Sequence, residues 1–269
     1  MENQEEISTF TPEAVHSALQ ARNCPMRVRI VSTLPSTNTA LREMAEQGAA
    51  EGEVLVALSQ SAGKGSLGRS FHSPSGTGLY FSVLLRPAFS LTDSRYLTLA
   101  AAVAVARALE QAGGRRMQIK WVNDIYSDGK KVCGILTEAA VDTANDRLRY
   151  AIVGVGVNLV APTDGFPEDI KGTAGAAFEG DPPNRAELLA DILAAFYRLY
   201  LALPAHGFMG EYRSRSCLVG RDVTVFVGDS VFEGTVQTVD DGGALVLSDR
   251  GGDIRTFHSG TVRLKENEM

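Results

Sequence analysis

The segment best suited to chemistry is residues 63–69, which have the sequence GKGSLGR and follow an apolar run at residues 54–58. Such an apolar run predicts a buried strand. Glycines tolerate positive φ and let backbone amides approach a ligand, and Lys64 and Arg69 add positive charge. The segment therefore predicts a loop that binds an anion such as phosphate. A flexible glycine-rich surface loop is the alternative.

Two familiar phosphate-binding motifs are similar in sequence to this segment, but the residues around it do not fit either of them. The dinucleotide fingerprint G-x-G-x-x-G must open a helix that holds the pyrophosphate at its N-terminus. Here Pro74, Gly76 and Gly78 follow, so no helix is predicted to start. A P-loop needs Ser or Thr directly after its Gly-Lys pair, whereas Gly65 follows Lys64. The loop thus belongs to neither nucleotide-binding class.

Metal, disulfide and histidine chemistry have no support in the sequence. Cys24, Cys133 and Cys217 are isolated and lack metal-ligand spacing, and the four histidines are scattered. We therefore predict free thiols in a reducing compartment and no metal-binding residues. The N-terminus has no signal-peptide pattern, and no apolar run reaches the ~20 residues of a membrane span. We expect a cytoplasmic protein with no membrane partner.

Length and charge limit the domain organisation and the partners. The 269 residues are 44% hydrophobic, which is enough for one large domain and a small one. The net charge of −6 argues against a general nucleic-acid-binding surface, so we expect no DNA partner.

The predicted strands and helices that must position the loop can be read along the chain. Thr11 and Pro12 predict the start of a short N-terminal helix, and Asn184 caps a long amphipathic one. Predicted strands cover residues 26–33, 54–58, 78–85, 119–126, 132–139 and 149–158. The predicted helices after the N-terminal one cover residues 36–47, 93–112, 184–203 and 206–214. Helix 93–112 should stop at Gly113-Gly114. Strands followed by helices indicate an α+β layer arrangement.

The sequence pattern changes from long strands and helices to short strands after residue 217. Short alternating strands at residues 223–227, 231–239, 244–247 and 254–257 are separated by glycine-rich turns. This pattern predicts a small β-barrel of about fifty residues.

Three segments together resemble biotin protein ligases. They are Ser36-Thr37-Asn38 at a helix start, residues 60–69 followed by Ser73-Pro74, and residues 120–124 with 131–138. The resemblance extends from about residue 26 onward. It implies a mixed sheet with packed helices, the class II synthetase-like catalytic domain, at residues 26–216. An SH3-like barrel at 217–269 and an N-terminal arm at 1–25 complete the chain. We expect the monofunctional class, without an N-terminal DNA-binding domain.

The resemblance implies a two-step reaction. MgATP adenylates biotin to biotinyl-5'-AMP, and the biotinyl group then passes to a lysine of a biotin carboxyl carrier protein. Both monomers and homodimers occur in such a family. The nearest alternative is a lipoate or octanoate ligase of the related fold. A biotin-responsive DNA-binding repressor and a noncatalytic module built on the SH3-like domain are more distant alternatives.

The resemblance also assigns site residues. Burying the ureido head of biotin requires paired donors and acceptors, since an unpaired one costs ~1–3 kcal/mol, and hydroxyl and amide side chains offer both. The implied biotin contacts are Ser36, Thr37, Asn38, Gln60, Gly63, Lys64, Gly65, Ser66, Lys131 and Gly134. The implied ATP or adenylate contacts are Lys64, Arg69, Trp121, Asn123, Asp124 and Asn158. Lys131 and Arg69 are the implied catalytic residues.

Two of these assignments have plain alternatives. The Ser36 triplet could serve only as a helix cap, and Trp121 could be a core residue. Lys131 lies beside an apolar strand, where a cation can meet the acid's carboxylate, while its neighbour Lys130 is expected to face solvent.

The sequence departs from the family at two positions. Ser66 stands where the loop usually carries an arginine, and Val122 stands where a proline is frequent. Arginine would hold an adenylate by charge-assisted bonds, whereas serine offers a neutral and shorter contact. We therefore predict weaker retention of biotinyl-adenylate. We also expect the loop to become ordered on ligand binding.

Overall fold

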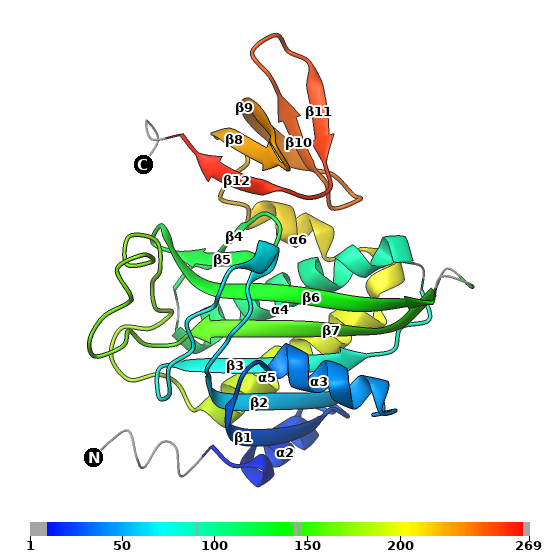
Figure 1. Cartoon of the computed structure of the whole chain (residues 1–269), viewed down its shortest axis with the longest axis vertical. Coiled ribbons are helices and arrows are strands. Elements are labelled where there is room, and N and C mark those ends of the chain that lie inside the picture. The colour runs from blue at the N-terminus through cyan, green and yellow to red at the C-terminus, as the bar shows by residue number, and fades with distance from the viewer. Residues whose placement is uncertain (1–9, 90, 114, 143–144, 146, 266–269) are drawn as a thin grey trace.

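The main feature of the fold is a seven-stranded mixed sheet with helices on both faces, next to a smaller sheet at the C-terminal end (Figure 1). The structure is a computed structural model that describes residues 10–89, 91–113, 115–142, 145 and 147–265. Residues 1–9 of the predicted arm, the predicted helix stop at Gly114, and residues 266–269 of the predicted C-terminal domain lie outside this description.

The large sheet has the strand order β1-β2-β3-β7-β6-β5-β4. Its strands are β1 Arg27–Leu34, β2 Glu53–Gln60, β3 Gly78–Leu85, β4 Gln118–Lys120, β5 Asp124–Ser127, β6 Lys130–Asp142 and β7 Arg147–Asn158. Strands β1 and β2 are parallel, and every other neighbouring pair is antiparallel. The predicted α+β class with a mixed sheet is therefore confirmed.

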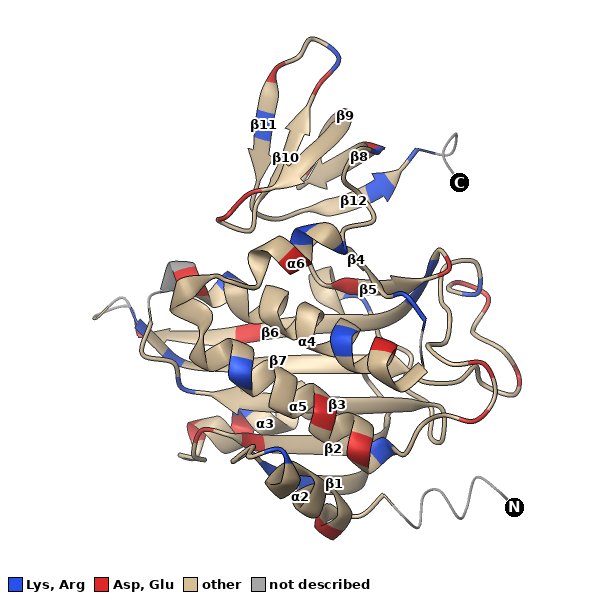
Figure 2. Cartoon of the chain, turned by 180° about the vertical axis from the view of Figure 1, so that it is seen from behind, with Lys and Arg blue, Asp and Glu red and all other residues tan. Residues whose placement is uncertain are grey.

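The helices divide between the two faces of this sheet. They are α2 Pro12–Ala21, α3 Thr37–Glu46, α4 Arg95–Gly113, α5 Arg185–Leu201 and α6 Met209–Ser214. Helices α4 and α5 cover one face, as the view from behind shows (Figure 2), while α3 packs on β2, β3 and β7 from the other. Alanines along α4 are almost fully buried, which lets this helix lie close to the sheet. The α3 face is left partly open, and the candidate site lies there.

Strand alternation explains why the two faces differ. In β7, Val153 and Val155 belong to the larger core under α4 and α5, whereas Tyr150 and Ile152 pack under α3. Gly154 continues the α3 face with no side chain at all. The α3 face therefore becomes shallow toward the end of β7, which leaves room for a ligand.

One predicted strand is wrong. The segment 119–126 is two antiparallel strands, β4 and β5, joined by a turn at residues 121–123 that brings Lys120 opposite Asp124. The alternation misled the prediction because Trp121 is buried like a strand residue, and no glycine or proline marks the turn.

Other boundaries differ by less. The helix predicted from residue 93 begins as a 3₁₀ turn, Leu91–Ser94, and the one predicted from residue 206 begins at Met209. His206 cannot start that helix because it takes a left-handed φ of 50° at the end of the 3₁₀ turn Leu203–Ala205. The caps predicted at Thr11 and Asn184 are confirmed: Thr11 accepts from the amide of Ala14 at 3.2 Å, and Asn184 from that of Ala186 at 2.9 Å. Ser36 occupies the N-cap position of α3 but makes no side-chain capping bond.

The C-terminal domain is a five-stranded antiparallel sheet with the order β11-β10-β9-β8-β12. Its strands are β8 Asp222–Val227, β9 Ser230–Val239, β10 Leu245–Ser248, β11 Ile254–Phe257 and β12 Thr261–Leu264. The sequence prediction missed β12. The sheet fits a small SH3-like domain, but β11 and β12 form its two edges in the described chain, so a closed barrel is not observed.

The turn between β9 and β10 joins this small sheet to the large domain. The Trp121 indole donates to the Gly243 carbonyl at 2.9 Å, and the Tyr96 hydroxyl donates to that of Asp241 at 2.9 Å. Arg213 pairs with the Asp241 carboxylate at 2.7 Å. Across the described residues, no helix has the length and apolar character that crossing a membrane requires.

Candidate functional site

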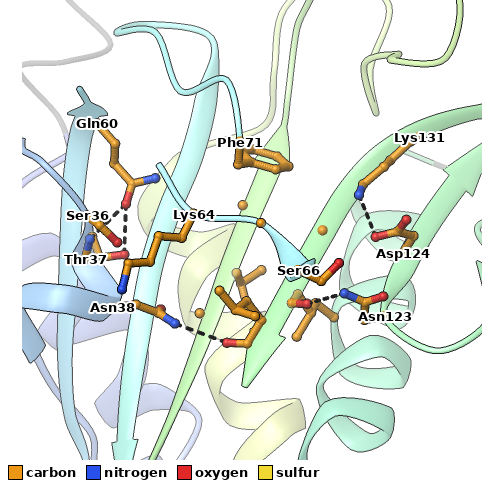
Figure 3. Close-up of a pocket in the computed structure, with 17 residues that line it drawn as sticks. Ser36, Thr37, Asn38, Gln60, Lys64, Ser66, Phe71, Asn123, Asp124 and Lys131 are labelled. Carbon is orange, nitrogen blue, oxygen red and sulfur yellow. Dashed lines mark hydrogen bonds and ion pairs between the residues drawn. The ribbon is translucent and has the colours of Figure 1, made fainter. Parts of the chain in front are cut away.

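A cavity on the α3 face collects residues from five separate segments of the chain (Figure 3). It holds about 450 Å³ of empty volume, which includes open solvent at its mouth. The sequence-predicted residues that line it are Ser36, Thr37, Asn38, Gln60, Lys64, Gly65, Ser66, Asn123, Asp124, Lys131 and Gly134. Residues more than ninety positions apart are thus brought into one site.

One end of the cavity is built from hydroxyl and amide groups. The backbone amide of Thr37 donates to Gln60 Oε1 at 2.9 Å, and the Thr37 hydroxyl donates to the same oxygen at 3.2 Å. The Gln60 amide nitrogen donates in turn to Ser73 Oγ at 2.9 Å. Ser36 occupies the N-cap position of α3, yet its side chain makes no capping bond. Its side chain therefore does not cap the helix and instead lines the cavity.

Asn38 is held rigidly beneath this end. Its Nδ2 donates to Glu138 Oε2 at 2.8 Å and to the Leu136 carbonyl at 3.3 Å, and its Oδ1 accepts from Ser82 Oγ at 2.6 Å. A Cβ added to Gly154 would lie 2.0 Å from Asn38 Oδ1. Gly154 is therefore required for Asn38 to occupy this position.

The glycine-rich loop crosses the mouth of the cavity from β2. We expected no helix after the glycines, and the loop contains only a single 3₁₀ turn, Ser66–Gly68. Arg69 folds back on this turn, donating to Ser66 O at 3.1 Å and Ser66 Oγ at 3.0 Å. At the tip, Leu67 has a φ of 57° and is 76% exposed. The tip of the loop therefore makes little contact with the rest of the protein.

Phe71 anchors the base of the loop on two glycines of the sheet. A Cβ at Gly156 would come within 2.6 Å of the Phe71 ring, and one at Gly134 within 3.2 Å. These glycines lie opposite each other in the β6–β7 register. Because neither glycine has a side chain, the Phe71 ring can pack directly against the sheet. This contact fixes the position of the base of the loop.

The opposite end of the cavity carries charge. Lys131 Nζ lies 2.6 Å from Asp124 Oδ1, across the neighbouring strands β6 and β5 (Figure 3). Asn123 donates to the Ile135 carbonyl at 2.6 Å, which leaves its amide oxygen for other partners. Lys130 is exposed, as expected, and its ammonium also donates to the backbone carbonyl of Gly172. Of the two lysines, only Lys131 reaches the cavity.

Lys120 lies next to this charged end. Its ammonium is 5.4 Å from the ring centroid of Tyr126. Burial lowers the pKa of Lys120, and the Asp124 carboxylate partly offsets this effect. Lys120 thus adds to the positive potential around Asp124 without lining the cavity.

Four predicted site residues lie outside the cavity lining. Gly63 is buried under the loop, and Arg69 is held by Ser66 on the exposed side. Trp121 is 4% exposed and faces the C-terminal domain, as its core alternative had it. Asn158 donates to the Gly175 carbonyl at 3.0 Å.

Sequence reasoning missed six lining residues and one supporting carboxylate. The lining residues are Phe71, Ile135, Leu136, Gly154, Val155 and Gly156. The carboxylate is that of Glu138, which bonds Asn38. A usable signal was present: Gly154 and Gly156 alternate with valines in an otherwise apolar strand, and such glycines often mark a close approach to a ligand or another backbone.

The cavity suits a ligand with a neutral polar head and an anionic end. Hydroxyl and amide groups supply donors and acceptors at one end, and Lys131 supplies positive charge at the other. Among the described residues, no group of three or more His, Cys, Asp and Glu side chains is placed to hold a metal ion.

Two family profiles match this chain. The profile of the Biotin/lipoate A/B protein ligase family matches residues 30–158, and that of the Biotin protein ligase C terminal domain matches residues 218–265. The bifunctional ligase/repressor BirA of Bacillus subtilis is 35% identical over 236 residues, which cover 86% of this chain and 72% of that relative. The biotin--[acetyl-CoA-carboxylase] ligase of Paracoccus denitrificans is 32% identical over 206 residues, covering 72% and 82%.

A solved structure agrees with these sequence matches. Biotin protein ligase from Aquifex aeolicus in complex with biotin and ATP superposes with a TM-score of 0.74 at 29% identity. The match covers 88% of this chain and 98% of that one. It spans nearly the whole of that structure.

Proposed function

The chain belongs to the biotin/lipoate A/B protein ligase family, and we propose that its cavity activates biotin with ATP and transfers the biotinyl group to a lysine of a biotin carboxyl carrier protein. The family name covers both biotin and lipoate ligases. The relatives at 32% identity or more are named as biotin ligases or as a ligase/repressor, and the Aquifex structure contains biotin and ATP. These findings favour biotin over lipoate.

The observation that carries the proposal is the pairing of a polar neutral end with a cationic end in one cavity. Ser36, Thr37 and Gln60 meet at the polar end and match the donors and acceptors of a ureido ring. A lipoyl dithiolane offers no strong hydrogen-bonding groups. It would gain none of the hydrogen bonds that a ureido ring can make with these side chains.

Lys131 acts in the first step. A carboxylate oxygen of biotin attacks the α-phosphorus of ATP, the bond from that phosphorus to the bridging oxygen breaks, and pyrophosphate leaves. The Lys131 ammonium lies at the charged end, where it draws the carboxylate in and stabilises negative charge on the phosphoryl oxygens. Its pairing with Asp124 at 2.6 Å fixes the ammonium before the ligand arrives.

Asp124 serves the second step. The amine of the acceptor lysine attacks the acyl carbon, the bond from that carbon to the phosphate oxygen breaks, and AMP leaves. The new amide nitrogen must lose a proton. Among the described residues that line the cavity, Asp124 is the only carboxylate, so it is the proposed acceptor of this proton.

The nucleotide is proposed to lie between the loop and the turn at residues 121–123. Asn123 has a free amide oxygen for a polar ligand atom, and Arg69 can reach phosphate if it leaves Ser66. Trp121 acts indirectly by supporting this turn. Mg²⁺ binds substrate phosphates, so it would enter with ATP and neutralise phosphate charge there.

Pyrophosphate exchange tests the proposal. Purified protein with ATP and magnesium is incubated with labelled pyrophosphate and biotin, lipoate or no acid. We expect exchange with biotin only, and a loss of about 10²–10³-fold in Lys131→Ala. Lys130→Ala is the matched control and should keep its activity, because Lys130 binds the backbone of Gly172. Exchange with lipoate alone would assign the other acid, and no exchange with either would refute the ligase function.

A further inference from the structure

Glu138 joins three segments of the site that are distant in sequence. Its Oε2 accepts from Asn38 Nδ2 at 2.8 Å, and its Oε1 lies 3.4 Å from Lys64 Nζ. Asn38 belongs to the start of α3, Lys64 to the glycine-rich loop and Glu138 to β6. Glu138 does not line the cavity but contacts two residues that do.

The loop has two cations, and they behave differently. Arg69 is held by Ser66 within the loop itself. Lys64 lines the cavity and extends toward the Asn38 side of the site (Figure 3), where Glu138 receives it. Among the described residues, the Lys64–Glu138 pair is the ion pair that ties the loop to the large sheet.

The Lys64–Glu138 ion pair is weak enough to be replaced by a ligand. Charge-assisted N–H···O bonds usually measure about 2.7–2.9 Å, so the 3.4 Å between Lys64 and Glu138 is long. The side chains are 36% and 29% exposed, which lets water and salt weaken the pair. By contrast, the Asn38 contact of the same carboxylate is short and backed by Gly154. Glu138 therefore stays fixed while Lys64 can leave.

We propose that Glu138 is a positioning residue that holds Lys64, and with it the glycine-rich loop, across the mouth of the empty cavity and releases Lys64 to an anionic group of the ligand. The anionic group is either the carboxylate of the acid or a phosphate of the nucleotide. This inference rests on the proposed function only for the identity of that ligand. The Lys64–Glu138 contact itself is observed in the structure and does not depend on that function.

Glu138→Gln is the sharp variant because its amide oxygen can still accept from Asn38, while the charge that attracts Lys64 is lost. The readout is the rate at which trypsin cuts the ligand-free loop after Arg69, followed by mass spectrometry. An exposed ion pair has a modest strength, so we expect cutting about two- to fivefold faster than in the wild type. Glu233→Gln removes a comparable pair with Lys265, in the C-terminal domain, and should leave the rate unchanged.

Two further measurements separate a tie from general loosening. Lys64→Gln should accelerate cutting to the same extent, and the double variant should be no faster than either single one, because one interaction is removed in each case. At about 1 M NaCl, where charges are screened beyond ~3 Å, the wild type should approach the rate of Glu138→Gln. Additive effects of the two substitutions, or an unchanged rate in Glu138→Gln, would overturn the proposal.

Ligands complete the test. Biotin alone, ATP alone and both together are added to wild type and Glu138→Gln, and the arm that removes the difference in rate identifies the anionic group that takes Lys64. If the ligands fully protect the wild-type loop from trypsin but Glu138→Gln is still cut faster, the proposed release of Lys64 is contradicted. Absence of protection by any ligand in the wild type would instead count against the proposed function, while leaving the ligand-free comparison valid.

Discussion

Gly154→Ala is expected to destabilise the protein through one specific clash. The added Cβ would lie 2.0 Å from Asn38 Oδ1 and 2.8 Å from its Cγ. Because real Cβ atoms essentially never approach another heavy atom closer than 3.0 Å, the Asn38 side chain must move by about 1 Å or β7 must bend. Either movement disturbs the hydrogen bonds of Asn38 with Ser82 and Glu138.

The cost can be worked out from these partners. Overpacking of this kind costs ~1–3 kcal/mol, and a buried amide that loses its partners costs ~1–3 kcal/mol more. Ser82 keeps Thr37 as a second partner at 2.7 Å, and the half-exposed Glu138 carboxylate can turn to water. Only the Asn38 amide therefore remains unpaired, and the free energy of unfolding should fall by about 3 kcal/mol. For a domain of this size, the melting temperature should fall by about 6–12 °C.

Urea denaturation of Gly154→Ala and three companion proteins is the assay. Gly210→Ala is the control, because its added Cβ meets open space within α6 and alanine favours a helix by ~0.5–1 kcal/mol. Asn38→Ala removes the atoms that the new methyl group strikes. The double variant should therefore be more stable than the sum of its single effects predicts. Wild-type stability in Gly154→Ala, or simple additivity with Asn38→Ala, would refute the reasoning.

Three further substitutions test other parts of the structure. Ser66→Arg should slow the release of labelled biotinyl-adenylate by about tenfold, since a charged hydrogen bond contributes ~1.5–3 kcal/mol; an unchanged release rate would contradict this. Trp121→Phe leaves the Gly243 carbonyl without its donor and should lower the free energy of unfolding by about 2 kcal/mol in urea, whereas wild-type stability would show that the contact is dispensable. The Arg107 guanidinium holds the pKa of Glu211 below its ordinary value of 4.5. A lowered carboxyl pKa gives stability that is present above the ordinary value and is lost as the pH falls below it. Thermal melts of Glu211→Gln between about pH 6 and 3 should therefore decline less steeply than those of the wild type. Parallel curves would exclude this carboxylate as a source of acid sensitivity.

The parts of the site that the sequence predicts are those carried by short contiguous motifs. Lys64 and Lys131 each stand in a segment whose letters already suggest anion binding, and both line the cavity. Local rules also predicted β3 and the caps of α2 and α5, because strand apolarity and capping depend on neighbours within four residues.

The supporting contacts could not be predicted because they join distant positions. Asn38 and Glu138 lie 100 residues apart, and nothing local in either segment indicates the other. Trp121 was assigned to the nucleotide by its motif, yet the large sheet directs its indole toward Gly243, 122 residues away. Motif resemblance thus identifies which segments form a site but not which way each side chain faces.

The charges around the cavity explain how an acidic chain can receive an anionic ligand. The two lysines that line the cavity are each paired with a carboxylate, Lys131 with Asp124 at 2.6 Å and Lys64 with Glu138 at 3.4 Å. These pairs leave the charges around the cavity nearly balanced, and an arriving anion must compete for the cations. The longer and more exposed pair should yield first. Under the proposed function, Lys131 keeps its partner Asp124 at the reacting end, while Lys64 leaves Glu138 for the ligand.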